Sequence, residues 1–280
     1  MSVKSIPRNS LKPKKKEESK PKGALAHLND LRSLLIKIIL VIIVATIIAF
    51  TVVKKLMNAL IFGMLSKDFI TNKILCSVYE PFCLTEFPVT FQAIKPTEQF
   101  TKAITFSVFI GFVVAFPFII FLIWRYLKEA LTPKERKIIK KVLIPIILLF
   151  LTGVFFSYFI LMPFMLNFFA HFSLNDKIEN RWQIGSLISL IVQTSLLIGL
   201  LFEMPVVSYY LGLIGFLSSK FLAKYRRHAI IVILVIAGLL TPSPDVISQL
   251  VLGVPMYFLY EFSIHVVKKA EKKRRQQLMN

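Results

Sequence analysis

The sequence has few of the residues that proteins use for catalysis or metal binding. It contains two cysteines and four histidines, and the histidines are dispersed along the chain. It also lacks a glycine-rich phosphate-binding loop, an HExxH zinc motif and a GxSxG nucleophile motif. These absences argue against an enzyme and against nucleotide hydrolysis. We therefore expect no catalytic residue, no cofactor and no metal site.

Acidic residues are scarce as well. The 280-residue chain has 15 Asp and Glu residues against 35 Lys and Arg residues, which gives a formal net charge of +20. A basic excess can indicate nucleic-acid binding, but 56% of this chain is hydrophobic. The apolar residues gather in long runs, whereas a soluble domain scatters them with the period of a strand or a helix. Nucleic acid is therefore not expected as a partner.

The long apolar runs predict an integral membrane protein. A helix needs about 20 apolar residues to cross a hydrocarbon core of about 30 Å, and these runs do not alternate as barrel strands do. We predict an all-α, polytopic fold. Its six expected transmembrane helices are Leu34–Val53, Ile104–Trp124, Val142–Phe169, Ile184–Leu217, Ala229–Leu240 and Ile247–Val267.

Two of these runs have unusual lengths. The fourth has 34 residues and only one charged residue, Glu203. That is long for one span and short for two, so we predict one tilted or kinked helix. The fifth has only 12 residues. With the sixth run it predicts a short hairpin that only just crosses the bilayer or thins it.

The basic residues predict the orientation. With six spans and the N-terminus inside, 26 of the 35 Lys and Arg residues lie in inside segments, eight lie outside, and Lys37 lies within the first span. By the positive-inside rule both termini are expected on the cytoplasmic side of the inner membrane, against anionic lipid. The expected domains are a disordered basic tail over 1–24, a membrane domain over 25–267 and a basic cytoplasmic tail over 268–280.

Two cytoplasmic segments contain candidate binding residues. Leucines 25, 28, 31 and 35 have helical spacing and predict an interfacial helix that includes Asp30. The first inside loop carries Glu129 and Glu135 among basic residues. Because arginine favours bidentate contacts with carboxylates, these acidic residues are candidate acceptors for a partner that carries arginines. An anchoring collar and paired surface charges are the alternative interpretations.

An acidic residue, Glu203, lies inside the fourth run. An ionisable group at membrane depth is costly and usually functional. The segment Glu203–Pro205 is also where a proline is expected to kink the helix. Alternatively, Glu203 could cap a polar cluster with Gln193, Thr194 or Gln249.

Two features of the expected outside segments have structural explanations. Ser243, Pro244 and Asp245 suit the N-cap and first turn of the last span. Cys76 and Cys83 lie together in the large outside loop and could form a disulfide if that compartment is oxidising.

Several segments together resemble the TatC family, the core receptor of twin-arginine protein translocases. The likeness covers nearly everything from His27 to Lys268, and its specificity comes from the order and spacing of the motifs. Pro117–Trp124, and Leu131 with Glu135 and Arg136, resemble the family's second span and first cytoplasmic loop. The sequences HLNDLR at 27–32, FEMP at 202–205, LTPSPDVISQ at 240–249 and VPMYFLYE at 254–261 resemble the family motifs HLxELR, FExP, LTPPDxxSQ and VPMYxLxE.

The resemblance implies a curved, cup-like bundle of six helices with two short final spans. It also implies docking of twin-arginine signal peptides on the cytoplasmic face and transport driven by the proton-motive force. The implied partners are TatA/TatB-type single-span proteins and other TatC copies.

Particular residues match functional positions of the family. Glu135 matches the loop glutamate that engages the arginine pair, and Leu28–Arg32 matches the other part of that site. Glu203 matches the buried acidic residue of the fourth span, and Gln249 a polar position near the small partner helices. The expected signal-peptide site is Leu28, Asp30, Leu31, Arg32, Glu129, Glu135 and Arg136, and the expected structural residues are Pro117, Pro163, Pro205, Pro244, Asp245 and Pro255.

Three positions depart from the family pattern. Asp30 stands where the family usually has glutamate, and its side chain is one methylene shorter. Glu129 stands where a proline is common, and it adds a third carboxylate near the expected site or alters the loop. Ala59 occupies a position where a proline is often found.

Other classes of function are open on the residues alone. A proton-coupled secondary transporter could use Glu203, but it predicts paired broken helices and an internal repeat, which the sequence does not show. A passive scaffold fits the topology but leaves the clustered cytoplasmic carboxylates unexplained. An intramembrane enzyme would need a nucleophile–base pair or a metal set.

Overall fold

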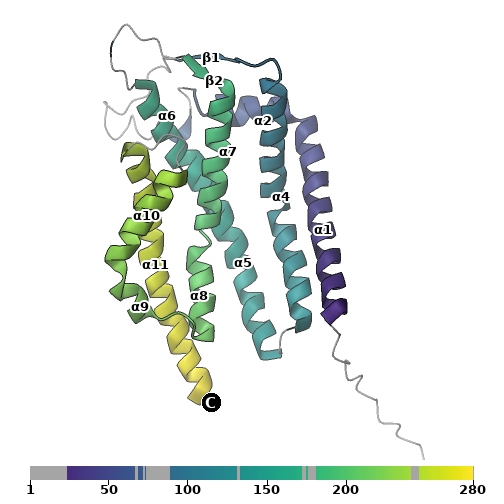
Figure 1. Cartoon of the computed structure of the whole chain (residues 1–280), viewed down its shortest axis with the longest axis vertical. Helices are drawn as coiled ribbons and strands as arrows, with labels where there is room; N and C mark the ends of the chain where they lie inside the picture. The colour runs from purple at the N-terminus through teal and green to yellow at the C-terminus, as the bar shows by residue number, and fades with distance from the viewer. Residues whose placement is uncertain are drawn as a thin grey trace, which may run out of the picture.

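The computed structural model describes residues 24–66, 69–71, 73, 89–130, 133–171, 175, 181–240 and 246–279. Long helices run side by side, and two short strands lie at one end of the bundle (Figure 1). We call that end the outer end, and the end where α1 begins and α11 finishes the inner end. The elements are α1 (Ala24–Thr51), α2 (Val53–Met57), the π-helix η1 (Asn58–Phe62), β1 (Thr90–Gln92), α4 (Glu98–Ala130), α5 (Pro133–Phe156), the π-helix η3 (Ser157–Leu161), α6 (Met162–His171), β2 (Arg181–Gln183), α7 (Ile184–Leu201), α8 (Met204–Ile214), α9 (Ser219–Lys224), α10 (Arg226–Leu240) and α11 (Val246–Met279).

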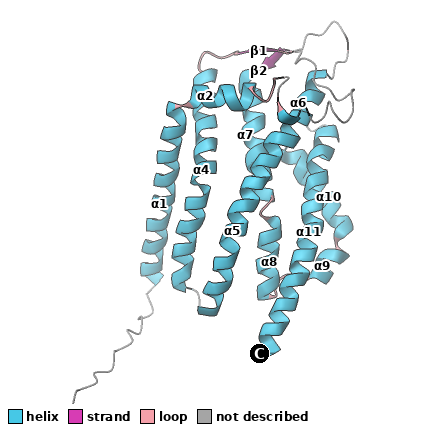
Figure 2. Cartoon of the chain, turned by 180° about the vertical axis from the view of Figure 1, so that it is seen from behind, coloured by secondary structure: helices cyan, strands magenta, loops and turns pink. Residues whose placement is uncertain are grey.

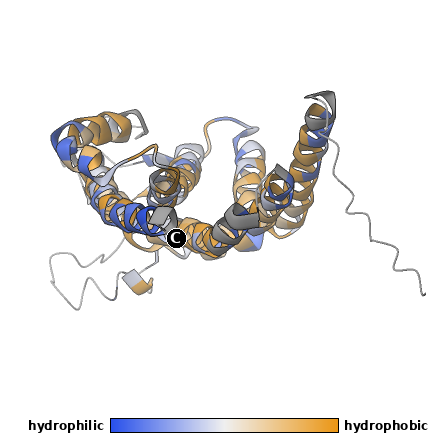
Figure 3. Ribbon diagram, turned by 90° about the horizontal axis from the view of Figure 1, so that it is seen from below, coloured by the Kyte–Doolittle hydropathy of each residue, from blue (hydrophilic) through white to orange (hydrophobic). Residues whose placement is uncertain are grey.

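The helices form a curved row when seen from the inner end (Figure 3). α1 packs along α4, α5 along α7, and α8 along α11, while α10 and α11 form a hairpin. The rear view shows that helices make up the body, with β1 and β2 at its outer edge (Figure 2). The predicted all-α, curved bundle is therefore confirmed.

Five helical stretches are long and apolar enough to cross a bilayer: Leu28–Thr51, Glu98–Glu129, Val142–Ala170, Ile184–Ile214 and Gln249–Gln276. The remaining predicted span corresponds to α10, which has 15 residues. At about 1.5 Å per residue it is about 22 Å long, less than the thickness of a typical hydrocarbon core. The short hairpin predicted from the 12-residue run is present as α10 and α11, and the sixth crossing stays a prediction.

The long fourth run is one helical stretch with a break. α7 ends at Leu201 and α8 begins at Met204, and Phe202 and Glu203 form a turn between them. Pro205, the second residue of α8, is buried. A proline in the first turn of a helix has no amide hydrogen to leave unpaired, so it can start α8 but could not continue α7. The kink predicted at Glu203–Pro205 is confirmed.

Small residues allow the helices to approach closely. A Cβ atom placed on Gly111 of α4 would lie 2.7 Å from the backbone nitrogen of Thr46 in α1. At the crossing of α5 and α7, a Cβ on Gly153 would lie 2.9 Å from the Cα of Gly199. Tight backbone contact through small residues is how helices commonly pack in membranes.

The apolar surface is consistent with a lipid environment. Of the apolar side chains on α1, Ile36, Ile39, Leu40 and Ile47 are each more than half exposed. In water such a surface would be an aggregation liability, whereas in a bilayer it contacts lipid chains. Buried side chains include Phe106, Phe150, Met162 and Ile198 of α4, α5, α6 and α7, and the core extends to α10 and α11.

Two helices are longer than the sequence suggested. The expected interfacial helix and the first span form one continuous helix, α1, because no Gly or Pro interrupts residues 24–51. α11 continues without a break past Val267 to Met279, so the expected basic tail begins as an extension of the last span. Pro117 and Pro255 lie within continuous helices, and Pro163 lies in the first turn of α6 directly after η3.

The structure adds a small parallel sheet that the sequence did not indicate. β1 pairs with β2 in the register Thr90–Arg181 to Gln92–Gln183. The positions of Cys76, Cys83, Pro244 and Asp245 lie outside the described residues, as does the N-terminal segment over residues 1–23.

Candidate functional site

A cleft at the inner end brings two of the expected acidic residues together. It has a volume of about 160 Å³ and lies between the beginning of α1 and the end of α4. Asp30 and Ser33 contribute from α1, and Arg125 and Glu129 contribute from α4, almost a hundred residues away. An arginine side chain entering the cleft would meet two carboxylates, in competition with Arg125 and with Lys37, which also lines the cleft.

The other expected residues of this site lie close in the chain. Leu28, Leu31 and Arg32 are exposed on α1 in the turns around Asp30. The exposed fractions of Leu28 and Leu31, 62% and 40%, give an apolar surface beside the cleft.

The inner loop places Glu135 at the same end as the cleft. α5 begins at Pro133, three residues after α4 ends at Ala130, so Glu135 stands in the first turn of α5. The side chain of Glu135 is outside the described part of the structure, and Arg136 is partly buried.

Glu203 occupies the break between α7 and α8. Its carboxyl group faces the backbone of Phe150 in α5. Its Oε1 atom is buried and has no hydrogen-bond partner among the described residues. A buried carboxyl oxygen without a donor is costly, and no hydrogen bond among the described residues offsets that cost at Oε1.

Gln249 lies far from Glu203. Its Nε2 atom donates a 2.7 Å hydrogen bond to the Leu234 carbonyl of α10, which ties the α10–α11 hairpin together. Gly212 of α8 packs against Val267 of α11, and both helices run toward the inner end (Figure 1). At about 1.5 Å per residue along each helix, counting back from this contact places Glu203 about 13 Å closer to the inner end than Gln249. The alternative polar cluster of these two residues is not formed.

Glu98 is a well-connected acidic residue that the sequence analysis missed. Its side chain is buried, and it accepts backbone hydrogen bonds from Ile94 at 2.9 Å and Lys95 at 3.3 Å. Its other oxygen accepts from the Gly185 amide at 2.9 Å, so it joins the start of α4 to the start of α7. Its position at the head of an apolar run was a signal for a helix-terminal carboxylate.

A group of polar side chains around Glu261 links the last three helices near the inner end. The guanidinium of Arg226 in α10 binds both carboxylate oxygens of Glu261 in α11, at 2.8 and 3.0 Å. The Tyr257 hydroxyl donates to Glu261 at 3.1 Å, and the Tyr260 hydroxyl donates to the Leu222 carbonyl of α9 at 2.7 Å. Glu261 therefore has a structural role in this arrangement.

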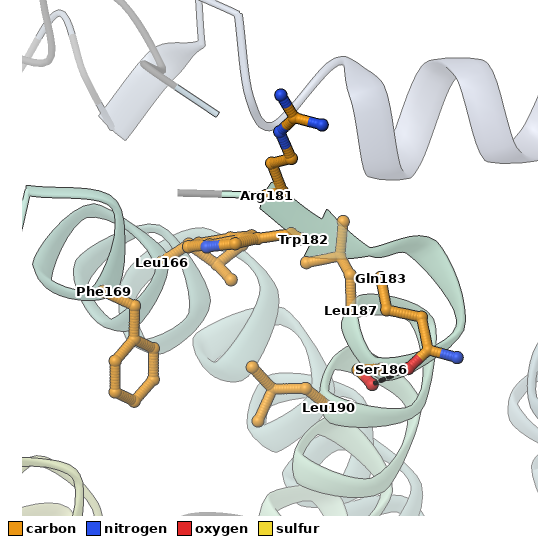
Figure 4. Close-up of a pocket in the computed structure, with 8 residues that line it drawn as sticks. All are labelled: Leu166, Phe169, Arg181, Trp182, Gln183, Ser186, Leu187 and Leu190. Carbon is orange, nitrogen blue, oxygen red and sulfur yellow. Dashed lines mark hydrogen bonds between the residues drawn. The ribbon is translucent and has the colours of Figure 1, made fainter. Parts of the chain in front are cut away.

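An apolar cavity at the outer end carries none of the expected site residues. It has a volume of about 430 Å³ between α6 and α7, next to β2. Figure 4 shows Phe169, Trp182 and Leu190 around it, whereas Arg181 points away. Ser186 donates a 3.3 Å hydrogen bond to Gln183 at its edge.

Comparisons with known proteins identify relatives over most of the chain. The family profile described as "TatC: Sec-independent protein translocase protein (TatC)" matches residues 26–255. The Sec-independent protein translocase protein TatC of Blattabacterium sp. subsp. Periplaneta americana is 32% identical over 89% of this chain and 96% of its own length. The TatC protein of Carboxydothermus hydrogenoformans is 32% identical over 90% of this chain and 95% of its own. The crystal structure of a twin-arginine translocase receptor, TatC, superimposes with a TM-score of 0.67 at 29% identity, covering 87% of this chain and 99% of that one.

Proposed function

Because this chain belongs to the TatC family of Sec-independent protein translocases, we propose that it is the core subunit and signal-peptide receptor of a twin-arginine translocase. It binds the twin-arginine signal peptides of precursor proteins and, with TatA/TatB-type single-span partners and other copies of itself, moves them across the membrane. The proton-motive force supplies the energy.

The cleft between α1 and α4 is the observation that carries the receptor assignment. It gathers Asp30 and Glu129 in one polar recess at the inner end, and Glu135 follows in the first turn of α5. Paired guanidinium groups bind best to several carboxylates with fixed geometry. In our proposal these three carboxylates hold the two arginines, and exposed Leu28 and Leu31 contact the apolar part of the signal peptide.

The departures from the family pattern fit this assignment. Asp30 is one methylene shorter than glutamate, which reduces its reach. Glu129 lines the same cleft. Its carboxylate can therefore compensate for the shorter reach of Asp30. The inserted signal peptide then runs along the concave side of the helix row toward Glu203, whose buried oxygen lacks a partner among the described residues.

Charge and chain direction support the proposed orientation. The described chain begins and ends at the same end of the bundle (Figure 1), which agrees with an even number of crossings. That end also carries the concentrated basic residues, so we assign it to the cytoplasm. α10 makes the short fifth crossing, with local thinning of the bilayer beside it.

Crosslinking of a precursor tests the site. A precursor with a photo-reactive group beside its arginine pair is added to membranes containing this chain, and its crosslinking is measured against concentration. Asp30→Asn, Glu129→Gln and Glu135→Gln keep side-chain shape but remove the charge. Loss of one charge-assisted contact weakens docking by about tenfold.

Two controls separate docking from general charge effects. Glu17→Gln removes the same charge from the basic N-terminal segment and leaves docking unchanged. A precursor whose arginine pair is replaced by two lysines, which cannot make bidentate contacts, is less sensitive to the three cleft variants than the arginine precursor. If Asp30→Asn and Glu135→Gln dock the arginine precursor as well as the parent chain does, the site assignment is wrong.

A further inference from the structure

A second, larger groove lies at the inner end, apart from the α1–α4 cleft. It has a volume of about 590 Å³ and runs between α9 and the last part of α11. Its floor includes Ala223 and the buried Ile264, and its rim is formed by cationic side chains. None of the residues expected for signal-peptide binding lines this groove.

The charged side chains that line the groove are mostly cationic. Lys220 approaches from α9, and Lys268, Lys272 and Arg275 approach from one face of α11, spaced by one or two helical turns. All four side chains are exposed, and none has an ion-pair or hydrogen-bond partner among the described residues. Four cations that converge without an acidic partner repel one another, and an anion between them would relieve that repulsion.

The acidic residue of the groove is already occupied. Glu271 accepts from the Ser219 backbone amide at 2.9 Å and from the Ser219 hydroxyl at 2.7 Å. The other cation, Arg226, is paired with Glu261. These bonds fix α9 against α11, so the groove is preformed and its four remaining cations face an open space.

The position of the groove along α11 places it at the level of the lipid headgroups. About 30 Å of α11, from Val246 to near Val267, spans the hydrocarbon core. Lys268, Lys272 and Arg275 follow within about 12 Å of its inner boundary. Two exposed aromatic side chains are close in the chain to Lys220: Phe216, just before α9, is 82% exposed, and Phe221 of α9 is 53% exposed. Exposed aromatic rings at this level insert among acyl chains.

We propose that this groove binds the phosphate of an anionic phospholipid from the inner leaflet. Lys220, Lys268, Lys272 and Arg275 contact the phosphate and headgroup oxygens, while Ala223 lies along the acyl chains. Cationic recesses between helices at the cytoplasmic surface are suited to such headgroups. The bound lipid links α9 to α11 and holds the inner ends of both helices at the membrane surface.

The chain offers a closely matched pair of variants for a test. Lys220→Gln with Lys272→Gln removes two groove cations, one from α9 and one from α11. Lys224→Gln with Lys269→Gln removes the same number of exposed lysines from the same two helices, outside the groove. Native mass spectrometry of the purified full chain, titrated with phosphatidylglycerol or phosphatidylcholine, counts bound lipid without any precursor present.

We expect selective binding of the anionic lipid, and a loss of that binding only when groove cations are removed. The parent chain binds phosphatidylglycerol over phosphatidylcholine, and the Lys220/Lys272 variant loses affinity for phosphatidylglycerol by on the order of tenfold. The Lys224/Lys269 variant changes by less than about twofold. Lys220→Arg with Lys272→Arg retains binding, which shows that charge rather than disturbed folding is responsible.

Three outcomes would overturn the proposal. Equal losses in both Gln variants would indicate a diffuse surface charge, and no loss in either would indicate that the groove binds no lipid phosphate. Displacement of the lipid by inorganic phosphate at an equal concentration would make the groove a site for a soluble anion.

Discussion

The crossing of α5 and α7 beside Glu203 makes a sharp prediction for Gly153→Ala. The new Cβ would lie 2.8 Å from Cγ of Phe202, 2.9 Å from Cα of Gly199 and 2.9 Å from the Ile198 carbonyl oxygen. Carbon atoms in contact normally lie about 3.5–4.0 Å apart, so these contacts are too short and α5 and α7 must move apart to relieve them. Two of the three neighbours are backbone atoms, which no side-chain rotation can move away.

The magnitude follows from two opposing effects. Overpacking of this kind costs about 1–3 kcal/mol, while alanine improves helix propensity over glycine by about 1 kcal/mol. Gly238→Ala in α10 isolates the second effect, because its nearest neighbour would be Nε2 of Gln249 at 3.4 Å, an ordinary contact. Gly153→Ala should therefore be less stable than Gly238→Ala by about 1–3 kcal/mol.

Thermal unfolding of the purified chain in detergent measures this difference. For a chain of this size, each kcal/mol lowers Tm by about 2–4 °C, so the two variants should differ by about 2–12 °C. The Gly153→Ala variant should also weaken precursor docking less than Asp30→Asn does, because the crossing lies far from the inner cleft. If Gly153→Ala melts as high as Gly238→Ala, the close approach of α5 and α7 is wrong.

Three further predictions concern the tertiary contacts. Glu98→Ala should speed hydrogen exchange of the Gly185 amide, because that amide donates to Glu98; unchanged exchange would contradict the contact. Gln249→Leu should lower the free energy of unfolding by about 0.5–1 kcal/mol through loss of one interhelical hydrogen bond, and a gain in stability would contradict it. A double-mutant cycle of Arg226→Ala and Glu261→Ala should give a coupling of at most about 1 kcal/mol, because Arg226 is 47% exposed; larger coupling would mean a drier environment.

Local sequence features predicted much of the helical architecture. Long apolar runs predicted the crossings, and Glu203–Pro205 predicted the break between α7 and α8. The interfacial helix was predicted to lead into the first span, and α1 is continuous over both. No Gly or Pro interrupts residues 24–51, so nothing breaks the helix between the two parts.

The candidate site could be predicted only in part. Asp30, Glu129 and Glu135 stood out because carboxylates are rare in the basic inner segments. Their scarcity indicated which residues to consider, but not which of them share a recess. Glu98 was overlooked because its partner, Gly185, lies far along the chain and contributes a backbone amide, which no residue pattern reveals.

The sequence by itself determined that the chain is helical and membrane-embedded, since burial of apolar runs in lipid depends on length and composition alone. Tertiary structure decided which polar groups meet. α1 and α4 bring Asp30 to Glu129, and α9 and α11 bring Lys220 to Lys272. The reason is physical: a span is specified by local transfer free energy, whereas a cleft depends on how separate helices pack, which close contacts at residues such as Gly111 set.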